Sequence, residues 1–369
     1  MTGPPAGRQP QPAATMPAGE QLRRDRLRTR RFADPGTAVS QVSETTLLHA
    51  LIDEARRTQA SGDAIVVGSG DDAAVWRPDP AALLVVTQDA VVEGVDYQPG
   101  WTPPYLVGRR SLTISLSDIA AMGAGPAWCV VTYCASPDVR YEDLLAIQQG
   151  LCDVATASGC AVIGGDVSRI DGPLVVDVAA GGSVRQGGIL RRDTGRPGDV
   201  LLVTGTLGRA AAGLRLLAGG RPGAAAGDGE RWVAAQLDPV ARLGEGPALA
   251  ALGVTCCGDL SDGLLVDAER TARSSGCAAE LWLGSVPADP GLASSFPAEW
   301  PALALAGGED FELLAAVPAP GAADLLRRWS PRLAPLTVVG QLVPGTGVRL
   351  LDRQGGAEMA KPAPASRHF

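Results

Sequence analysis

Apolar residues recur at helical spacing between positions 44 and 57, where Leu47, Leu51 and Ala55 fall on one side of a helix. The same spacing predicts further helices at about 103–122, 141–158, 209–217, 232–236, 247–252 and 264–272. Short β-branched and apolar runs predict strands at 64–67, 83–87, 128–133, 161–163, 174–178, 200–204, 279–283, 312–317 and 336–343. Strands that alternate with helices are typical of an α/β protein.

Turn-forming residues divide this pattern into two parts. The segment at 187–199 is rich in glycine, proline and arginine, which favours a domain boundary. We therefore expect a mixed α/β domain over 41–186 and a second α/β domain over 187–369. The first 40 residues are rich in Pro, Ala and Arg and are expected to be disordered, and 219–230 is expected to be a loop.

Five short segments combine aspartate with glycine, serine or threonine. Four of them are expected where a strand or helix ends in a turn, and they contain Asp72, Asp89, Asp166 and Asp262. A single aspartate after glycine is more often a turn former or a helix cap than a ligand. Asp118 differs, because it lies inside an apolar helical pattern where an unpaired charge would be costly to bury.

Residue types that support other chemistries are scarce. The 369 residues contain two histidines and one lysine, Lys361, and no GxxxxGK[ST] or GxSxG motif. These absences argue against a Walker-A nucleotide site, a protein kinase and a serine hydrolase. Carboxylates without such partners favour Mg²⁺, so metal-assisted phosphoryl transfer remains, with Arg191 or Arg192 available to hold phosphate oxygens.

Charge and cysteine usage narrow the partners further. Seven arginines and two acidic residues give the first 31 residues a net charge of +5. Because the whole chain has a net charge of −8, the remaining residues carry a net charge of −13. An acidic body argues against binding to nucleic acid or anionic membranes. No apolar run approaches the length of a membrane span. The seven cysteines form no CxxC pair and are expected to be buried free thiols in a reducing cytoplasm.

The aspartate segments, taken in order along the chain, resemble the thiamine-monophosphate kinase family, within the superfamily of aminoimidazole ribonucleotide synthetase and selenophosphate synthetase. The resemblance runs from about residue 43 to the end. Its matching stretches are GSGDDAAV (68–75), TQDAVVEGVDY (87–97), SLTISLSDIAAMGAGPAW (111–128), GGDVSR (164–169), LRRDTGRPGD (190–199), VTGTLGRAAAGL (203–214), DLSDGL (259–264) and ALAGGEDFEL (304–313).

The resemblance implies ATP-dependent phosphorylation of thiamine monophosphate to thiamine diphosphate, by in-line transfer assisted by several Mg²⁺ ions. It implies a two-domain PurM-like α/β fold and a cytoplasmic homodimer whose N-terminal domains pair. The implied metal ligands are Asp72, Thr87, Gln88, Asp89, Asp118, Asp166, Asp259 and Asp262. The implied ATP contacts are Gly165, Asp166, Arg192 and Ser261, and the implied catalytic residues are Asp118, Asp166 and Arg192. Asp96, Glu309 and Ser366 are placed at the thiamine phosphate.

Two of these acceptor positions depart from the family pattern. Asp96 stands where a histidine is usual, and Ser366 stands where an aromatic residue is usual. They favour, as an alternative, a related kinase with a different acceptor. A third interpretation, from another class, is a non-catalytic protein that binds Mg²⁺ and nucleotide. Selenophosphate synthetase is disfavoured because the N-terminal region lacks that family's reactive cysteine and lysine. Aminoimidazole ribonucleotide synthetase is disfavoured because the motifs DLSDGL and GGEDFEL resemble those of thiamine-monophosphate kinases more closely.

Overall fold

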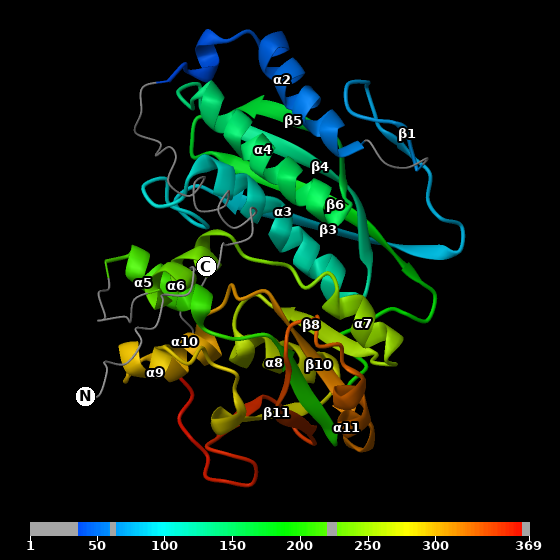
Figure 1. The fold of residues 1–369 in the computed structure, drawn as a ribbon, viewed down its shortest axis with the longest axis vertical. Coiled ribbons are helices and arrows are strands. Elements are labelled where there is room, and N and C mark those ends of the chain that lie inside the picture. The colour runs from blue at the N-terminus through cyan, green and yellow to red at the C-terminus, as the bar shows by residue number, and fades with distance from the viewer. Residues whose placement is uncertain (1–35, 60–63, 220–226, 364–369) are drawn as a thin grey trace, which may run out of the picture.

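Two β-sheets, stacked along the long axis of the molecule, organise the chain (Figure 1). A computed structural model describes residues 36–59, 64–219 and 227–363. Most of the predicted N-terminal extension, part of the predicted loop at 219–230, and Ser366 lie outside these residues. Within them, no helix is long and apolar enough to cross a membrane.

The first sheet has four strands in the order β3-β6-β4-β5, antiparallel except for the β4/β5 pair. These strands are β3 (Ala82–Val92), β4 (Gly125–Ala135), β5 (Ala161–Arg169) and β6 (Val175–Arg185). Helices α2 (Glu44–Arg56), α3 (Pro104–Ala121) and α4 (Tyr141–Ser158) cover one face and share a core with it. A separate pair, β1 (Ile65–Val67) and β2 (Val75–Trp76), forms a small antiparallel ribbon.

The other face of the first sheet is more open. Side chains alternate between the faces of a strand, and on β3 the exposed positions include Leu84, Val86 and Gln88. Leu84 and Val86 are 52% and 64% exposed. We call this side of the sheet the open face.

The second sheet has six strands in the order β12-β9-β11-β7-β10-β8, all antiparallel except β12/β9. Its strands are β7 (Asp199–Thr204), β8 (Cys256–Leu260), β9 (Ala278–Trp282), β10 (Glu312–Pro318), β11 (Leu336–Val343) and β12 (Val348–Leu351). The helices of this half are α5 (Arg209–Leu217), α6 (Asp228–Leu237), α7 (Glu245–Ala251), α8 (Leu264–Ser274), α9 (Leu292–Ser295), α10 (Trp300–Ala306) and α11 (Ala319–Arg328).

Helices cover both faces of this second sheet. The core on one face includes residues of α8 and α10, and the core on the other face includes residues of α7 and α11. The segment between Arg185 and Asp199 joins the two sheets. Independent folding of two domains divided at residue 187 stays a prediction.

Helix α3 connects the two halves of the molecule. A Cβ added at Gly108 would lie 1.8 Å from the carbonyl oxygen of Ile147, so α3 and α4 touch backbone to backbone. At its other end, a Cβ on Gly246 of α7 would lie 1.9 Å from the carbonyl oxygen of Ala120. Helix α3 therefore packs against a helix of each half.

The helix predictions at 103–122, 141–158 and 209–217 are confirmed, and the strand prediction at 336–343 matches β11. All four strands of the first sheet are longer than predicted, and as a result Asp89 and Asp166 lie within β3 and β5 and not in turns after them. Pairing with neighbours extends these strands through polar residues that carry no strand signal of their own. The predicted loop at 219–230 is also too long, because α6 begins at Asp228. Five elements were not predicted: β2, α9, α10, α11 and β12.

Candidate active site

Three aspartates from different elements gather where the first sheet, α3 and the second sheet meet. They are Asp89 on β3, Asp118 on α3 and Asp259 on β8, and we call them the carboxylate cluster. Thr87 Oγ1 donates a hydrogen bond of 2.6 Å to Asp118 Oδ2. Serine hydroxyls of α3 hold the other two, because Ser115 donates to Asp89 and Ser117 to Asp259, each at 2.9 Å.

The cluster concentrates negative charge in a poorly solvated place. Burial, and then the neighbouring charge of Asp118, raise the pKa of Asp89 to about 6. Burial and Asp118 also raise the pKa of Asp259, which is 3% exposed, although Arg192 and Ser117 act in the opposite direction. Carboxylates that repel one another and lack water are stabilised by a cation, so this donor set fits a hard metal ion.

The described residues do not enclose such an ion by themselves. Across 36–59, 64–219 and 227–363, no three His, Cys, Asp or Glu side chains are placed closely enough to hold a metal. Mg²⁺ commonly keeps several water ligands and takes only one or two protein carboxylates together with phosphate oxygens.

Gln88 does not lie with the cluster, although both of its neighbours in the sequence do. Because side chains alternate along a strand, Thr87 and Asp89 face α3 while Gln88 points to the open face. There Gln88 Nε2 donates a hydrogen bond of 2.7 Å to Asp177 Oδ2 on β6.

Arginines neutralise the second-domain side of the cluster. Arg192 Nη2 forms an ion pair of 2.9 Å with Asp259 Oδ1, and its side chain remains 37% exposed. Asp262 pairs with Arg270 at 2.5 Å. The backbone N–H of Asp262 also donates to Asp267, whose pKa burial raises to about 7. Asp262 is therefore close to Asp259 in the sequence but pairs with a different arginine, Arg270.

A second group of predicted residues lines a separate cavity of about 730 Å³ between α2, β4 and β5. Asp72, Gly165 and Asp166 contribute to its wall, together with Asp71. Ser168 Oγ donates a hydrogen bond of 2.8 Å to Asp166 Oδ2. The structure thus brings Asp72 and Asp166 to the same cavity, at a different place from the hydrogen bonds that join Thr87, Asp118 and the α3 serines.

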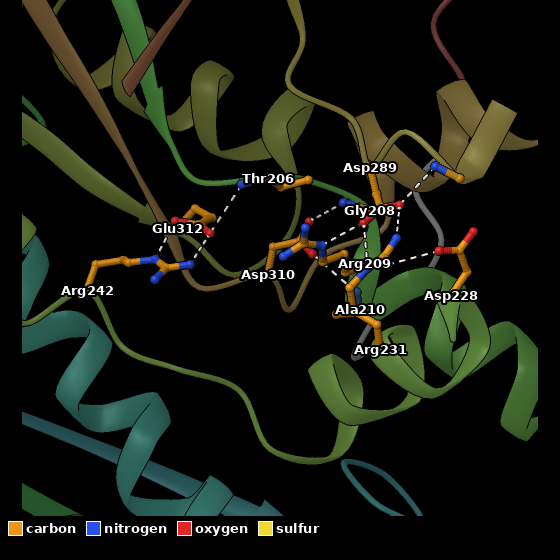
Figure 2. Close-up of polar contacts among 11 residues, drawn as sticks. Thr206, Gly208, Arg209, Ala210, Asp228, Arg231, Arg242, Asp289, Asp310 and Glu312 are labelled. Carbon is orange, nitrogen blue, oxygen red and sulfur yellow. Dashed lines mark hydrogen bonds and ion pairs between the residues drawn. The ribbon is translucent and has the colours of Figure 1, made fainter. Parts of the chain in front are cut away.

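The loop after α10 carries the predicted acceptor residue Glu309. Both Glu309 and Phe311 adopt left-handed backbone conformations, with φ of 61° and 50°. Between them, Asp310 accepts hydrogen bonds from the backbone N–H groups of Gly208 and Ala210 at 2.7 and 3.2 Å (Figure 2). Asp310 therefore anchors this loop to the first turn of α5. Burial raises the pKa of Asp310 to about 7, although the two hydrogen bonds from Gly208 and Ala210 act to lower it.

The loop also meets the segment that follows β8. The backbone N–H of Glu309 donates to the carbonyl of Ser261 at 2.8 Å, and that of Phe311 donates to Leu260 at 3.0 Å. Further along, Arg242 binds the carboxylate of Glu312, as Figure 2 shows. Ser261, predicted at ATP, and Glu309, predicted at the acceptor, are thus direct neighbours.

The side chain of Glu309 has two partners that sequence reasoning missed. Arg110 of α3 pairs with Oε1, and Gln236 Nε2 of α6 donates to Oε2 at 2.5 Å. Arg110 and Arg109 are two adjacent charges within the predicted helix at 103–122, and this pair of charges was the available signal.

Asp96 lies near these two residues. It lines a cavity of about 180 Å³ together with Trp101, Arg110 and Gln236. Its Oδ2 accepts a hydrogen bond of 2.8 Å from the backbone N–H of Val92, so one carboxylate oxygen is engaged within its own turn. Ser366, the remaining predicted acceptor contact, lies outside the described residues.

Comparisons with known proteins agree with this two-part architecture. Residues 70–184 match the AIR synthase related protein N-terminal domain, and residues 196–353 match the corresponding C-terminal domain. Thiamine-monophosphate kinase of Escherichia coli (strain K12) is 34% identical over 290 residues, covering 78% of this chain and 87% of that protein.

Two solved structures extend the likeness to three dimensions. Thiamine-monophosphate kinase from Stenotrophomonas maltophilia K279a has a TM-score of 0.75 and 35% identity, covering 82% of this chain and 95% of that chain. AaThiL complexed with AMPPCP and TMP has a TM-score of 0.66 and 27% identity, covering 84% and 95%. The predicted two-domain PurM-like fold is confirmed.

Proposed function

The chain belongs to the thiamine-monophosphate kinase family of AIR synthase related proteins, and we propose that it transfers the γ-phosphoryl group of ATP in line onto the phosphate of thiamine monophosphate. Membership makes it a kinase. The observation that carries the finer proposal is the carboxylate cluster, where three aspartates and Thr87 meet at the junction of the two sheets.

Mg²⁺ is the cofactor that this donor set fits. When bound, such ions neutralise the charge of phosphate oxygens and hold them in place. In this proposal Asp89, Asp118 and Asp259 bind metal from the cluster, with Thr87 fixing the Asp118 carboxylate. Asp262 supports them from the second domain, and Asp72 and Asp166 contribute from the cavity beside β5. Gln88 is left out because it points to the opposite face.

The nucleotide is proposed to contact Gly165, Asp166, Arg192 and Ser261. An added Cβ at Gly165 would lie 2.1 Å from the carbonyl oxygen of Val131, so glycine allows β4 and β5 to approach closely here, and the nucleotide would meet Gly165 through its backbone. Arg192 is bound to Asp259 through Nη2 only and is partly exposed, so its other N–H groups can bind phosphate oxygens. This combination would hold the two polyanionic reactants together, which is the main electrostatic task in phosphoryl transfer.

No general base is required for this reaction. The attacking group is an oxygen of a phosphate monoester, and it is already ionised at neutral pH. A site that consists of carboxylates and arginine, without histidine or lysine, is therefore sufficient. The low histidine and lysine content of the chain is consistent with this chemistry.

The acceptor is proposed to bind near Asp96 and Glu309. Asp96 lines the cavity beside Trp101, and an acidic wall favours the cationic thiazolium ring or the amino group of the acceptor over its phosphate. A different acceptor with cationic or hydrogen-bond-donor groups remains the second candidate, on the same observation.

The quaternary structure in this proposal is a homodimer that pairs through the open face of the first sheet. The exposed side chains of Leu84 and Val86 on β3 form an apolar surface of the kind that is usually covered by a partner. The cytoplasmic location expected from the resemblance stays a prediction.

Incubation of the purified protein with ATP, Mg²⁺ and thiamine monophosphate tests the proposed function. We expect stoichiometric formation of thiamine diphosphate and ADP, measured by chromatography, and no product in the presence of EDTA. Thiamine with ATP serves as the control acceptor, because it lacks the phosphate oxygen that attacks. Binding of ATP without thiamine diphosphate formation would reject the proposal in favour of another acceptor or of a non-catalytic protein.

A further inference from the structure

The carboxylate of Glu309 is held from both halves of the molecule. Arg110, on α3, pairs with Oε1 through Nη2. Gln236, at the end of α6, donates from Nε2 to Oε2 at 2.5 Å. The two partners are themselves joined, because Arg110 Nη1 donates to the backbone carbonyl of Gln236 at 3.0 Å. Glu309, Arg110 and Gln236 therefore form a closed triangle, which we call the Glu309 clamp.

The buried polar groups of the clamp are not all hydrogen-bonded, so its contribution to stability is small. Arg110 is 4% exposed and Gln236 is 7% exposed, whereas the Glu309 side chain keeps 32% of its surface. Arg110 Nε and Gln236 Oε1 are buried without a hydrogen-bond partner in the described chain. A buried ion pair with incomplete partners gains little stability over apolar packing, and such groups concentrate at functional sites.

The backbone places Glu309 in a single orientation for this contact. Its φ of 61° is a left-handed conformation that glutamate rarely adopts. Asp310 prevents relaxation, because both of its carboxylate oxygens are bound to backbone N–H groups at the start of α5. Strain of this kind persists where the surroundings fix the conformation, and it is common in binding sites.

We propose that Arg110 and Gln236 are positioning residues that aim the Glu309 carboxylate at hydrogen-bond donors of the acceptor. Both also line the cavity that contains Asp96 and Trp101, so the clamp borders the proposed acceptor pocket. Each Glu309 oxygen has two lone pairs and uses one within the clamp, which leaves acceptor capacity on the exposed side. The inference rests on the proposed function, since it assigns how one acceptor contact of that same site is held.

Substitution of Arg110 by methionine tests the positioning role. Met keeps an unbranched apolar stem and removes the charge and both donors to the clamp. We expect R110M to raise the KM for thiamine monophosphate by about 10-fold or more, with the KM for ATP changed less than about 2-fold. Q236L is the second variant, because it removes the donor to Oε2 together with an oxygen that has no hydrogen-bond partner among the described residues. We expect it to raise the KM for thiamine monophosphate less than R110M does and to leave the melting temperature unchanged.

Arg109 provides a matched control. It is the preceding residue of α3 and pairs with Asp238 at 2.7 Å, with side-chain exposures of 15% and 7%, so it is also a shielded ion pair between α3 and the second half of the chain. It makes no hydrogen bond or ion pair with Glu309. We expect R109M to lower the melting temperature while the KM for thiamine monophosphate stays at the wild-type value.

A double-mutant cycle with E309Q separates positioning from a direct role. If Arg110 acts through Glu309, R110M adds little to the KM of E309Q, so the two effects do not multiply. Multiplying effects, or equal increases in both KM values, would overturn the inference. If R110M does not fold, Q236L alone decides, and an unchanged acceptor KM in it counts against the clamp. Failure of the wild-type protein to form thiamine diphosphate would instead reject the proposed function.

Discussion

At the scale of single residues, the most informative feature is a set of carboxylates in surroundings that disfavour their charge. Ser115 and Ser117 each stabilise one of them, and Thr87 stabilises the third. Neutral hydroxyl groups donate hydrogen bonds but add no positive charge. Burial and the repulsion from Asp118, which together raise the pKa of Asp89, therefore remain for a cation to offset.

Substitution of Asp118 by asparagine separates the charge of this residue from its hydrogen bond. The amide oxygen can still accept from Thr87, but one negative charge leaves the cluster. We expect turnover to fall by about 100-fold or more, because Asp118 is one of the proposed metal ligands. In EDTA, we expect a melting temperature equal to the wild type or a few degrees higher, since repulsion with Asp89 is relieved.

Asp171 supplies the control for this substitution. Its side chain is 90% exposed and it pairs with Arg169 at the surface, so D171N should leave turnover unchanged. Near-normal activity of D118N would remove Asp118 from the site.

At the scale of elements, α3 is the helix on which the site depends. It supplies Arg110, Ser115, Ser117 and Asp118, and it packs against both α4 and α7. Contact with α4 is possible because glycine lies at the crossing on each helix. A Cβ on Gly150 would lie 1.9 Å from the carbonyl oxygen of Tyr105, which is a backbone atom and cannot move aside.

Substitution of Gly150 by alanine should therefore force α3 and α4 apart. We expect the free energy of unfolding to fall by about 1–3 kcal/mol or more, measured by chemical denaturation. Gly321 is the matched control, because it also lies within a helix, α11, and has no atom within 4 Å of its added Cβ. G321A should stabilise by about 0.5–1 kcal/mol. Equal effects of the two substitutions would contradict the close crossing.

The helices α5 and α6 are tied to the loop before α9 by one buried carboxylate. Asp289 binds Arg209 at 2.7 Å and Arg231 at 2.8 Å, and Figure 2 shows these contacts around it. Burial alone would raise the pKa of Asp289, but the hydrogen bonds from Arg231 and Arg209 outweigh it and lower the pKa to about 2.

This lowered pKa predicts a specific pH dependence. An aspartate whose pKa is depressed on folding contributes stability that is fully present above about pH 4 and is lost as the pH falls towards 2. We expect D289N to cost about 1–2 kcal/mol at pH 7, and the gap to the wild type should narrow below pH 4. Denaturation curves at pH 7, 4 and 3 measure this, and a gap that stays constant would contradict the ion-pair origin.

At the scale of the whole molecule, the open face of the first sheet distinguishes the two halves. The second sheet is covered on both sides, whereas Leu84 and Val86 leave apolar surface on the first. Pairing of two such faces would cover this surface and would also enclose Gln88 and Asp177.

Substitution of Val86 by glutamate tests the proposed homodimer. A charge at the centre of an apolar interface is costly, so V86E should be a monomer where the wild type is a dimer, as measured by light scattering after size-exclusion chromatography. Val240 is 48% exposed and lies after α6, so V240E should leave the dimer intact. A monomeric wild type, or dimeric V86E, would refute pairing through this face.

Much of this molecule could be anticipated from local pattern. The ends of α4 and of β11 followed from periodicity, because apolar spacing and turn residues act within a few positions. Asp118 was identified from the same pattern, as a charge inside an apolar helix, and it does lie with two other carboxylates. The ends of β3 and β5 were wrong, because the strands beside them extend their hydrogen bonding through Asp89 and Asp166.

Residue types and short-range spacing were enough to predict the alternation of strands and helices, the family and the acidic character of the site. Which aspartates lie together depends on the folded arrangement of distant segments. The tertiary structure separated Gln88 from its neighbours by strand alternation, and it placed Arg110 and Gln236 on Glu309 across 199 and 73 positions of chain. Contacts over such separations arise because α3 packs against β8 and α6 packs against α3, and no local pattern encodes them.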